Sequence, residues 1–294
     1  MPSLLPPLLG LALALVPGWA QGPMRYLHNA PESPSDHRYD YQWTMLREVL
    51  ERTRRAWGPY ELGTAPAMPE RRQVEELASG QGRLTVMVLG TTEALERTLL
   101  PVRIPVDKDL QGHCVFLIRD GEQGRFSAIR SVKDLAPFRF GLGQGWIDVE
   151  ILQAAGLQVV TGSDYEGLFD MLAERRFDVF LRSAVEVLDE LETRQAQYPS
   201  LRIEEGLLLH YPMPMYFWFP RTPEGQRLAD RVAEGLRALL AEGAFDRLFL
   251  RFQKPKIDRL RLRSRRVLEL PNPLLPRATP LADRRLWFDL RRGW

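Results

Sequence analysis

The sequence is poor in the residues that build disulfide frameworks and metal centres. It has one cysteine, Cys114, and four histidines, His28, His37, His113 and His210. A single cysteine excludes an internal disulfide and any zinc site made of several cysteines. The histidines also lack ligand spacing such as His-x-x-x-His. We therefore expect no metal site and no cofactor.

The sequence also lacks a strong excess of one charge and a biased composition. Forty Lys and Arg residues stand against 38 Asp and Glu residues, which leaves a net charge of +2. Apolar residues make up 45% and charged residues 27% of the 294 residues. These values are ordinary for globular proteins and exclude disorder, collagen and coiled coil as the main state. The chain has no aromatic and basic platform for nucleic acid, so we expect no nucleic-acid partner.

The longest apolar run lies at the N-terminus, where residues 8–16 are apolar apart from a glycine. Pro17 ends the run, and Gly18 and Ala20 stand at the spacing of a signal-peptidase site. This pattern predicts a signal peptide over residues 1–20 and a periplasmic protein that begins near Gln21. An uncleaved anchor helix is the alternative, although the run is shorter than the ~20 residues of a membrane span. No cysteine follows the run, so we do not expect a lipoprotein.

The mature chain alternates between strand and helix patterns. We expect strands over 24–27, 60–62, 84–89, 114–118, 138–142, 157–160, 177–181, 207–211 and 215–219. We expect helices over 41–57, 69–79, 147–155, 165–174, 184–196, 224–242 and 245–252. Alternation of this kind predicts an α/β fold with a mostly parallel sheet. Two such units predict two lobes with a ligand cleft between them, residues 21–106 plus 212–253 and residues 107–211.

The C-terminal extension, residues 254–294, has a different composition. It carries twelve basic and four acidic residues, and Pro271, Pro273, Pro276 and Pro280 break any long helix there. Its leucines and aromatic residues provide apolar surface for docking. We expect an extended, basic, proline-rich strap that lies on the two lobes. A basic arm for anionic lipid or a membrane partner is the alternative.

The segment 86–106, VMVLGTTEALERTLLPVRIPV, is the most informative about function. A buried strand delivers Thr91 and Thr92 to its carboxyl end, and a helix with Glu96 and Arg97 follows. Hydroxyls, amide groups and a guanidinium would meet there and hold an anionic group of a ligand. The alternative is that a threonine only caps the helix and Arg97 is solvated.

The order of several motifs resembles the family 3 extracellular solute-binding proteins. Gly-Thr-Thr is followed by Glu96-Arg97 and Ile104-Pro105, with one extra residue between Thr92 and Arg97. FLIR, DLAPFRFGLGQG and RFDVF come next, and the resemblance covers about residues 24–253. These proteins are the periplasmic amino-acid receptors of ABC importers. The resemblance implies a two-lobed type II periplasmic-binding-protein-like fold.

The resemblance also implies roles for individual residues. Arg97 would bind a ligand carboxylate with the help of Thr92, and an aromatic residue, Tyr39 or Tyr41, would form the floor of the site. The backbone amides of a turn at a helix N-terminus in the second lobe would cap the same group. That turn consists of Gln144, Gly145 and Trp146. Trp146 packing within its lobe is the alternative.

One departure from the family pattern bears on the ligand. Where family members carry an acidic residue for the ligand's ammonium group, this chain has Arg182 and Ser183. Two arginines facing the cleft would suit a dicarboxylate or another anion, because unpaired buried cations are costly. The alternative is that Arg182 points into solvent or pairs with Glu186 one helical turn later.

We therefore expect a non-enzymatic, monomeric binding protein for a small polar or anionic ligand. Its partner would be an inner-membrane permease or a sensor. One alternative is an orphan module of the same fold that acts through protein contacts, for example through the strap. Another is an enzyme similar to cyclohexadienyl dehydratases, for which Asp148, Glu150 and Glu166 are the candidate general acids.

Overall fold

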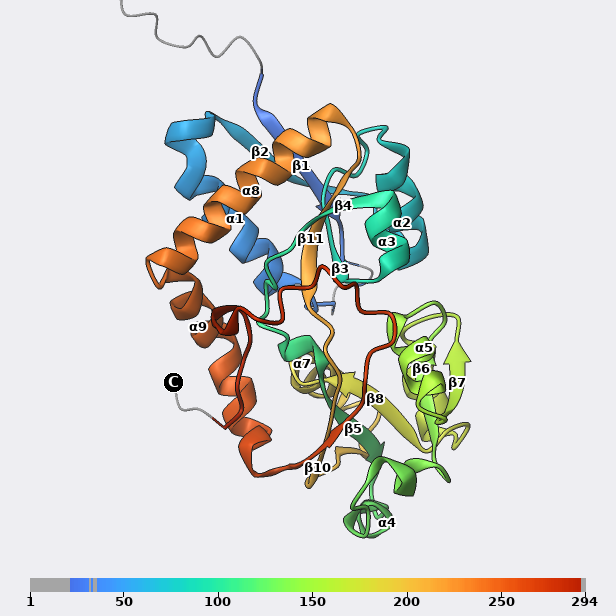
Figure 1. Cartoon of the computed structure of the whole chain (residues 1–294). Coiled ribbons are helices and arrows are strands. Elements are labelled where there is room, and N and C mark those ends of the chain that lie inside the picture. The colour runs from blue at the N-terminus through green and yellow to red at the C-terminus, as the bar shows by residue number, and fades with distance from the viewer. Residues whose placement is uncertain (1–21, 32, 34–35, 292–294) are drawn as a thin grey trace, which may run out of the picture.

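The computed structural model describes residues 22–31, 33 and 36–291. The expected signal peptide, residues 1–20, lies outside the described residues. Within them, no helix is both long and apolar enough to cross a bilayer. The chain forms an upper and a lower lobe, and one long helix runs along the side of both (Figure 1). We call the upper part the first lobe and the lower part the second lobe.

The first lobe contains two small sheets. β1 (Met24–Asn29) and β2 (Tyr60–Ala65) pair in parallel, and their first partners are Met24 and Tyr60. In the other sheet, β11 (Met215–Pro220) lies between β3 (Met87–Gly90) and β4 (Leu99–Val102) and is antiparallel to both. The expectation of a mostly parallel sheet is therefore wrong here, because the central strand returns from the second lobe in the opposite direction.

The second lobe is built on one mixed sheet in the order β12-β10-β5-β8-β6-β7, with β9 beside β5. Its strands are β5 (His113–Arg119), β6 (Arg139–Gly143), β7 (Gln158–Gly162), β8 (Val179–Ser183), β9 (Leu201–Ile203), β10 (Leu207–His210) and β12 (Arg266–Glu269). β6 is parallel to both of its neighbours, whereas β5 is antiparallel to β8, β9 and β10. β5 is buried along its whole length, in agreement with the apolar sequence from which we expected a strand.

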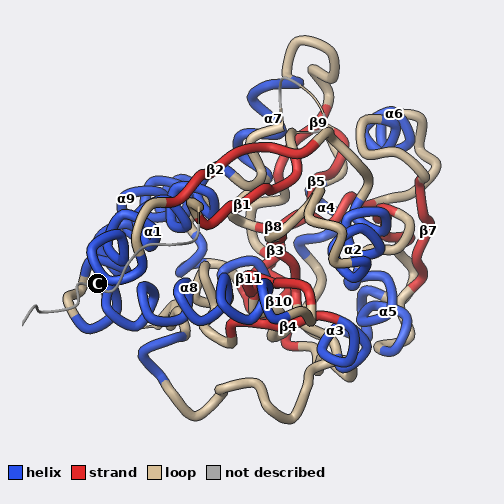
Figure 2. The backbone as a smooth tube through the Cα atoms, turned by 90° about the horizontal axis from the view of Figure 1, so that it is seen from above, coloured by secondary structure: helices blue, strands red, loops and turns tan. Residues whose placement is uncertain are grey.

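Helices cover these sheets, as Figure 2 shows from above. They are α1 (Asp40–Trp57), α2 (Glu70–Ser79), α3 (Glu93–Thr98), α4 (Gln123–Ser127), α5 (Ile147–Ala154), α6 (Gly167–Ala173), α7 (Val187–Arg194), α8 (Pro223–Ala241) and α9 (Ala244–Arg259). The apolar residues of α1 at helical spacing face the core, where Met45, Leu46, Val49 and Leu50 are fully buried. Burial of such a face is what stabilises the helix.

The chain crosses between the lobes after β4 and again after β10, and these two crossings touch at Gly112. The amide of Tyr211 donates to the carbonyl of Gly112 at 3.2 Å. A Cβ atom on Gly112 would lie 2.1 Å from the carbonyl oxygen of Tyr211, so the backbones meet where only glycine fits. The amide of Met213 donates to a carboxylate oxygen of Asp109 at 2.6 Å. Side chain and backbone together fasten one crossing to the other.

The C-terminal extension docks on both lobes. Its helix runs six residues beyond our expected boundary at 253, since α9 continues to Arg259 with Pro255 inside it. β12 then adds an edge strand beside β10, and Leu268 and Leu270 join the core of the second lobe. Farther along, Trp287 and Phe288 pack against a core cluster that contains residues of the first lobe and α9 together with Val115 and Leu208 of the second lobe. In Figure 1 the extension, drawn in red, follows the lower lobe and returns to the upper one.

The contact at Gly112 predicts a large difference between two glycine substitutions. We expect Gly112→Ala to lower the free energy of unfolding by about 1–3 kcal/mol, because the new methyl group collides with backbone. Gly124→Ala is the matched control, since a Cβ atom there meets nothing within 4 Å. Thermal and urea unfolding of the two variants measures the difference. Equal stability of the two would contradict the tight crossing.

Candidate functional site

A large cavity lies between the lobes and is lined by residues from both. Its volume is about 670 Å³. The first lobe contributes Tyr39, Glu70 and Thr92, and the second contributes Trp146 and Tyr165. A smaller cavity of about 60 Å³ shares Tyr39, Glu70 and Trp146 with it and has Arg182 in its wall. We call them the outer and the inner cavity. The outer cavity is large enough for a drug-sized solute.

Charged residues of the outer cavity are mostly acidic. Two arginines, Arg38 and Arg71, line it. Against them stand five carboxylates, from Glu70, Glu75, Glu150, Asp164 and Glu166. Two of these are paired, Glu75 with Arg71 at 3.1 Å and Glu166 with Arg194 at 2.6 Å. The potential inside a narrow space follows the sign of the charges on its wall. The cavity therefore favours a cationic group over an anionic one.

Arg182, the cation that suggested an anionic ligand, is buried and neutralised. Its guanidinium pairs with Glu186 at 2.6 Å, and its Nε donates to Glu190 at 2.8 Å. The expected pairing with Glu186 is confirmed, and the expectation that the side chain points into solvent is wrong, because it is only 5% exposed. With two carboxylates in contact, this guanidinium has no charge to spare for a ligand anion.

The pKa values of this cluster follow from burial and pairing. Burial acts to lower the pKa of Arg182, but the attraction of Glu190 and Glu186 outweighs it and raises the pKa. Burial acts to raise the pKa of Glu190, but Arg182 and the donated hydrogen bond from Tyr165 hold it below its usual value. Burial keeps the pKa of Glu186 above its usual value. Arg182 and Glu190 therefore form the charged core of the cluster.

The segment that precedes α1 reaches into the space between the lobes. Arg38 lines both cavities, and its guanidinium binds the Asp36 carboxylate with bonds of 2.8 and 2.9 Å. Both side chains are buried, with exposures of 9% and 3%. The same guanidinium lies 4.3 Å from the centre of the Tyr165 ring in the second lobe. A guanidinium of the chain itself thus packs on an aromatic wall of the cavity.

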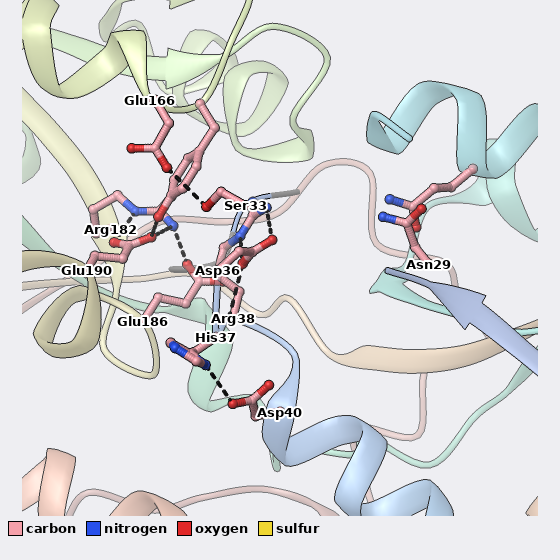
Figure 3. Close-up of polar contacts among 12 residues, drawn as sticks. Asn29, Ser33, Asp36, His37, Arg38, Asp40, Glu166, Arg182, Glu186 and Glu190 are labelled. Carbon is pink, nitrogen blue, oxygen red and sulfur yellow. Dashed lines mark hydrogen bonds and ion pairs between the residues drawn. The ribbon is translucent and has the colours of Figure 1, made fainter. Parts of the chain in front are cut away.

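Figure 3 shows how closely this segment approaches the second lobe. Asp36 and Arg38 lie beside Glu186, a member of the Arg182 cluster, and Ser33 faces Glu166. The Ser33 hydroxyl donates to the Glu166 carboxylate at 3.5 Å, while Arg194 holds the same carboxylate at 2.6 and 2.8 Å. Polar contacts of this segment therefore join the two lobes across the cavity.

The residues expected at the ligand's carboxylate are dispersed in the structure. Arg97 is exposed in the last turn of α3 and lines neither cavity. Its neighbour Glu96 pairs with Arg103 at 2.6 Å. Thr92 lines the outer cavity, but its hydroxyl accepts the amide of Leu95 at 3.1 Å as a helix cap. Thr91 is fully buried beside Glu96, away from both cavities.

The turn whose backbone amides we expected to bind an anion lies at the outer cavity, but two of these amides already donate hydrogen bonds within the protein. Gln144, Gly145 and Trp146 all line the outer cavity. The amide of Gln144 donates to Gly162 at 2.8 Å, and that of Trp146 donates to Gly143 at 3.2 Å. The Trp146 ring lies 4.9 Å from the Arg182 guanidinium. An aromatic wall is a better description of this turn than an anion-binding nest.

The remaining expected residues divide between cavity and core. Ser183 lines the inner cavity and is buried. Tyr41 is also buried, but it lies off both cavities and donates its hydroxyl to Val106 at 2.7 Å. Tyr39, the other aromatic candidate, lines both. Sequence reasoning missed the roles of Arg38, Glu70, Tyr165 and Glu190. For Glu190 a signal existed, because it follows Glu186 by four residues and therefore lies on the same face of a helix.

Comparison with solved structures identifies the fold. An ancestral arginine-binding protein bound to arginine superposes with a TM-score of 0.56 at 14% identity over 79% of this chain and 98% of its own. A periplasmic binding protein from Salmonella typhimurium, described as having high arginine specificity, gives 0.55 at 13% identity over 78% and 98%. An arginine-bound amino acid ABC transporter substrate-binding protein from Streptococcus pneumoniae gives 0.54 at 12% identity over 73% and 82%.

The expected two-lobed periplasmic-binding-protein-like fold is thereby confirmed. No family model matches the sequence. No curated protein matches it either. At identities this low the likeness defines the architecture, and the lining of the cavity has to decide what the site accepts.

The buried cluster predicts a strong effect on stability. We expect Arg182→Met to lower the free energy of unfolding by about 3–5 kcal/mol, because two carboxylates are left buried without their partner. The control is Arg176→Met, which breaks an exposed pair with Glu174 and should cost about 0–1 kcal/mol. Urea unfolding followed by circular dichroism measures both. A cost for Arg182→Met no larger than that of the control would refute the assignment.

Proposed function

We propose that the chain is a solute-binding protein that captures a small polar solute between its lobes. The observation that carries this proposal is the cavity of about 670 Å³ with walls from both lobes. Several structures of the same fold are amino-acid-binding proteins of ABC transporters. In this proposal the lobes are residues 21–106 plus 212–253 and residues 107–211. The protein works as a monomer in the periplasm and hands its solute to an inner-membrane permease or a sensor.

The solute we propose carries a cationic group, and the proposal is for an amino-acid-like compound with a guanidinium or ammonium side chain. The outer cavity supports this class because Glu70, Glu150 and Asp164 line it in addition to Glu75 and Glu166, which pair with Arg71 and Arg194. The place of Arg38 beside Tyr165 and Asp36 supports it further, because that pocket already holds a guanidinium. A dicarboxylate, which two free arginines would suit, is disfavoured because Arg182 is paired and Arg97 is off the cavity.

The cavity wall defines the residues of the proposed site. From the sequence-predicted set we retain Thr92, Gln144, Gly145, Trp146, Arg182 and Ser183. Tyr39, Glu70, Glu150 and Tyr165 join them because they line the outer cavity. Arg182 acts through Glu190 and Trp146 as a positioning residue. Arg97, Thr91 and Tyr41 do not line either cavity among the described residues.

The orphan module is the second candidate, and a specific observation favours it. Arg38 and Asp36 fill part of the space between the lobes, and the C-terminal extension is packed on both lobes. A protein held in this way would present a fixed surface to a protein partner and bind no solute. Of the candidate acids of the enzyme alternative, Glu166 pairs with Arg194 and Asp148 accepts a hydrogen bond from Tyr211, whereas Glu150 lines the outer cavity.

A ligand screen distinguishes these proposals. We expect arginine, lysine or agmatine to raise the melting temperature, because a solute that binds only the folded state stabilises it by RT ln(1 + [L]/Kd). Glutamate and succinate should produce no shift. Differential scanning fluorimetry with about 0.01–10 mM of each compound, which exceeds any Kd in the micromolar range, measures the effect. A flat response to all five compounds would favour the orphan module.

Charge variants locate the bound cation. Glu150→Gln should weaken binding about two- to fivefold, because it removes one partly solvated carboxylate from the wall. Glu174→Gln is the control in the same lobe, since its carboxylate faces solvent beside Arg176. Arg97→Ala should leave the Kd unchanged within about twofold. A loss of binding in Arg97→Ala would place the site at the position implied by the family resemblance.

The contact of Arg38 with the cavity predicts competition with the solute. We expect Arg38→Gln to bind the cationic solute about tenfold more tightly, because the chain's own guanidinium then no longer occupies the place beside Asp36 and Tyr165. Asp36 is kept in this variant, because its carboxylate would pair with the cation of the solute in place of Arg38. Isothermal titration calorimetry measures the Kd. Unchanged affinity would mean that Arg38 and the solute occupy different places.

A further inference from the structure

A second cluster of chemistry-bearing side chains lies where the two crossings meet. Asp109, His113 and His210 each offer one ligand atom, and these atoms all lie within 4.8 Å of one another. None of the three lines the outer or the inner cavity. We propose that this cluster binds a divalent transition-metal ion of the zinc type. The proposal is independent of the solute cavity.

The backbone fixes the three side chains in place. His113 begins β5 and His210 ends β10, and the two residues are direct partners in the antiparallel ladder. Directly opposite residues project from the same face of a sheet, and the centres of these two rings are 4.2 Å apart. Asp109 precedes His113 by one short turn, Leu110–Gly112. Two strands and a turn therefore present a carboxylate and two imidazoles to one point.

Hydrogen bonds orient both imidazole rings, and in His113 they leave Nε2 for a metal. The Nδ1 of His113 lies 3.0 Å from the carbonyl oxygen of Asp109, which can only accept, so this nitrogen carries the proton and Nε2 keeps its lone pair. The Nδ1 of His210 lies 2.6 Å from the Glu269 carboxylate. An imidazole oriented by a carboxylate or carbonyl is the usual arrangement around a metal-bound histidine.

The spacing on the other side of His210 is about 0.1 Å shorter than the shortest distance between two ligand atoms of a tetrahedral ion. The Nε2 of His210 forms a hydrogen bond of 3.2 Å with Oδ2 of Asp109, and a bound ion would replace the proton between these two atoms. Two ligand atoms bound at about 2.0–2.2 Å in tetrahedral geometry are about 3.3–3.6 Å apart. The other oxygen of Asp109 accepts the amide of Met213 at 2.6 Å, which directs Oδ2 toward the histidine. Two imidazoles and one carboxylate form a donor set that zinc accepts, with a fourth position open to water.

Backbone strain next to the cluster supports the proposed metal site independently of the side-chain geometry. Lys108 and Asp109 have φ angles of 53° and 67°, consecutive left-handed conformations that are uncommon for residues other than glycine. Aspartate tolerates this conformation, whereas lysine does not do so readily. Strain of this kind persists where the surrounding structure enforces it and gathers at functional sites. Here it sets the direction of the Asp109 side chain.

The position of the cluster suggests what the ion would do. Asp109 and His113 belong to the first crossing, His210 ends the strand before the second crossing, and Glu269 belongs to β12 of the C-terminal extension. Phe288 from the end of the extension packs edge-on against His113, with ring centres 6.0 Å apart. A bound ion would join both crossings and fasten the extension over them. The partly exposed His210 and Glu269 side chains leave a path for entry.

Metal binding to the purified full chain tests the proposal. After removal of metal with a chelator, we expect one Zn²⁺ per chain in a competition titration with a chromophoric chelator, and a higher melting temperature. Co²⁺ should give the visible absorption of a tetrahedral site. Mg²⁺ and Ca²⁺ should not compete, because they prefer sites made of oxygen ligands.

Three variants decide whether the ion is at the cluster. His210→Ala should abolish stoichiometric binding, and Glu269→Gln should weaken it about 10–100-fold, as expected for a residue that orients a ligand. His37→Ala is the control, because this exposed histidine pairs only locally with Asp40. Glu269 is on the surface, so its variant is informative even if His210→Ala misfolds. The proposal is overturned if wild-type protein binds no Zn²⁺, or if Glu269→Gln binds it as tightly as His37→Ala does.

Discussion

The backbone contact between the two crossings at Gly112 is the constraint on which the rest of the structure depends. The carbonyl of Tyr211 is so close that a methyl group has no room at Gly112. This contact sends β11 back into the first lobe between β3 and β4, and it holds β5 beside β10 in the second. It therefore fixes how closely the two crossings approach each other at the junction of the lobes. It also brings His113 next to His210, which lie far apart in the sequence.

Two further features limit how far the lobes can separate. α9 contacts the second lobe through Lys256, whose ammonium group pairs with Asp189 at 2.6 Å, while its first half packs in the core of the first lobe. The extension continues this link, because Leu274 lines the outer cavity and accepts the amide of Glu93 in α3. Binding proteins of this architecture work by closing around a solute. In this chain such a motion has to carry α9 and the extension with it.

Charge pairing explains why the ligand class inferred from sequence differs from the one inferred from structure. From the sequence, Arg182 is interpreted as an unpaired cation after the strand 177–181. The sequence shows only which residues are neighbours along the chain, so it does not show which side chains contact each other in space. In the structure Arg182 is neutralised by two glutamates from the next helical segment. Arg97 differs for a local reason: one extra residue in a helix turns a side chain by about 100° around the axis. The family pattern thus indicates that an arginine is present in this helix, but it does not indicate which way its side chain points.

The sequence alone determined the two α/β units, most strands and helices within a few residues, and the docked extension, because periodicity of apolar residues decides which face of each element is buried. It also placed Gln144–Trp146 and Thr92 near the cavity, since loops at strand ends gather at one edge. The tertiary structure decided the strand order, the neutralisation of Arg182, the entry of Arg38 into the cavity and the meeting of the two histidines. Each of these depends on contacts between distant segments, and local spacing carries no information about such contacts.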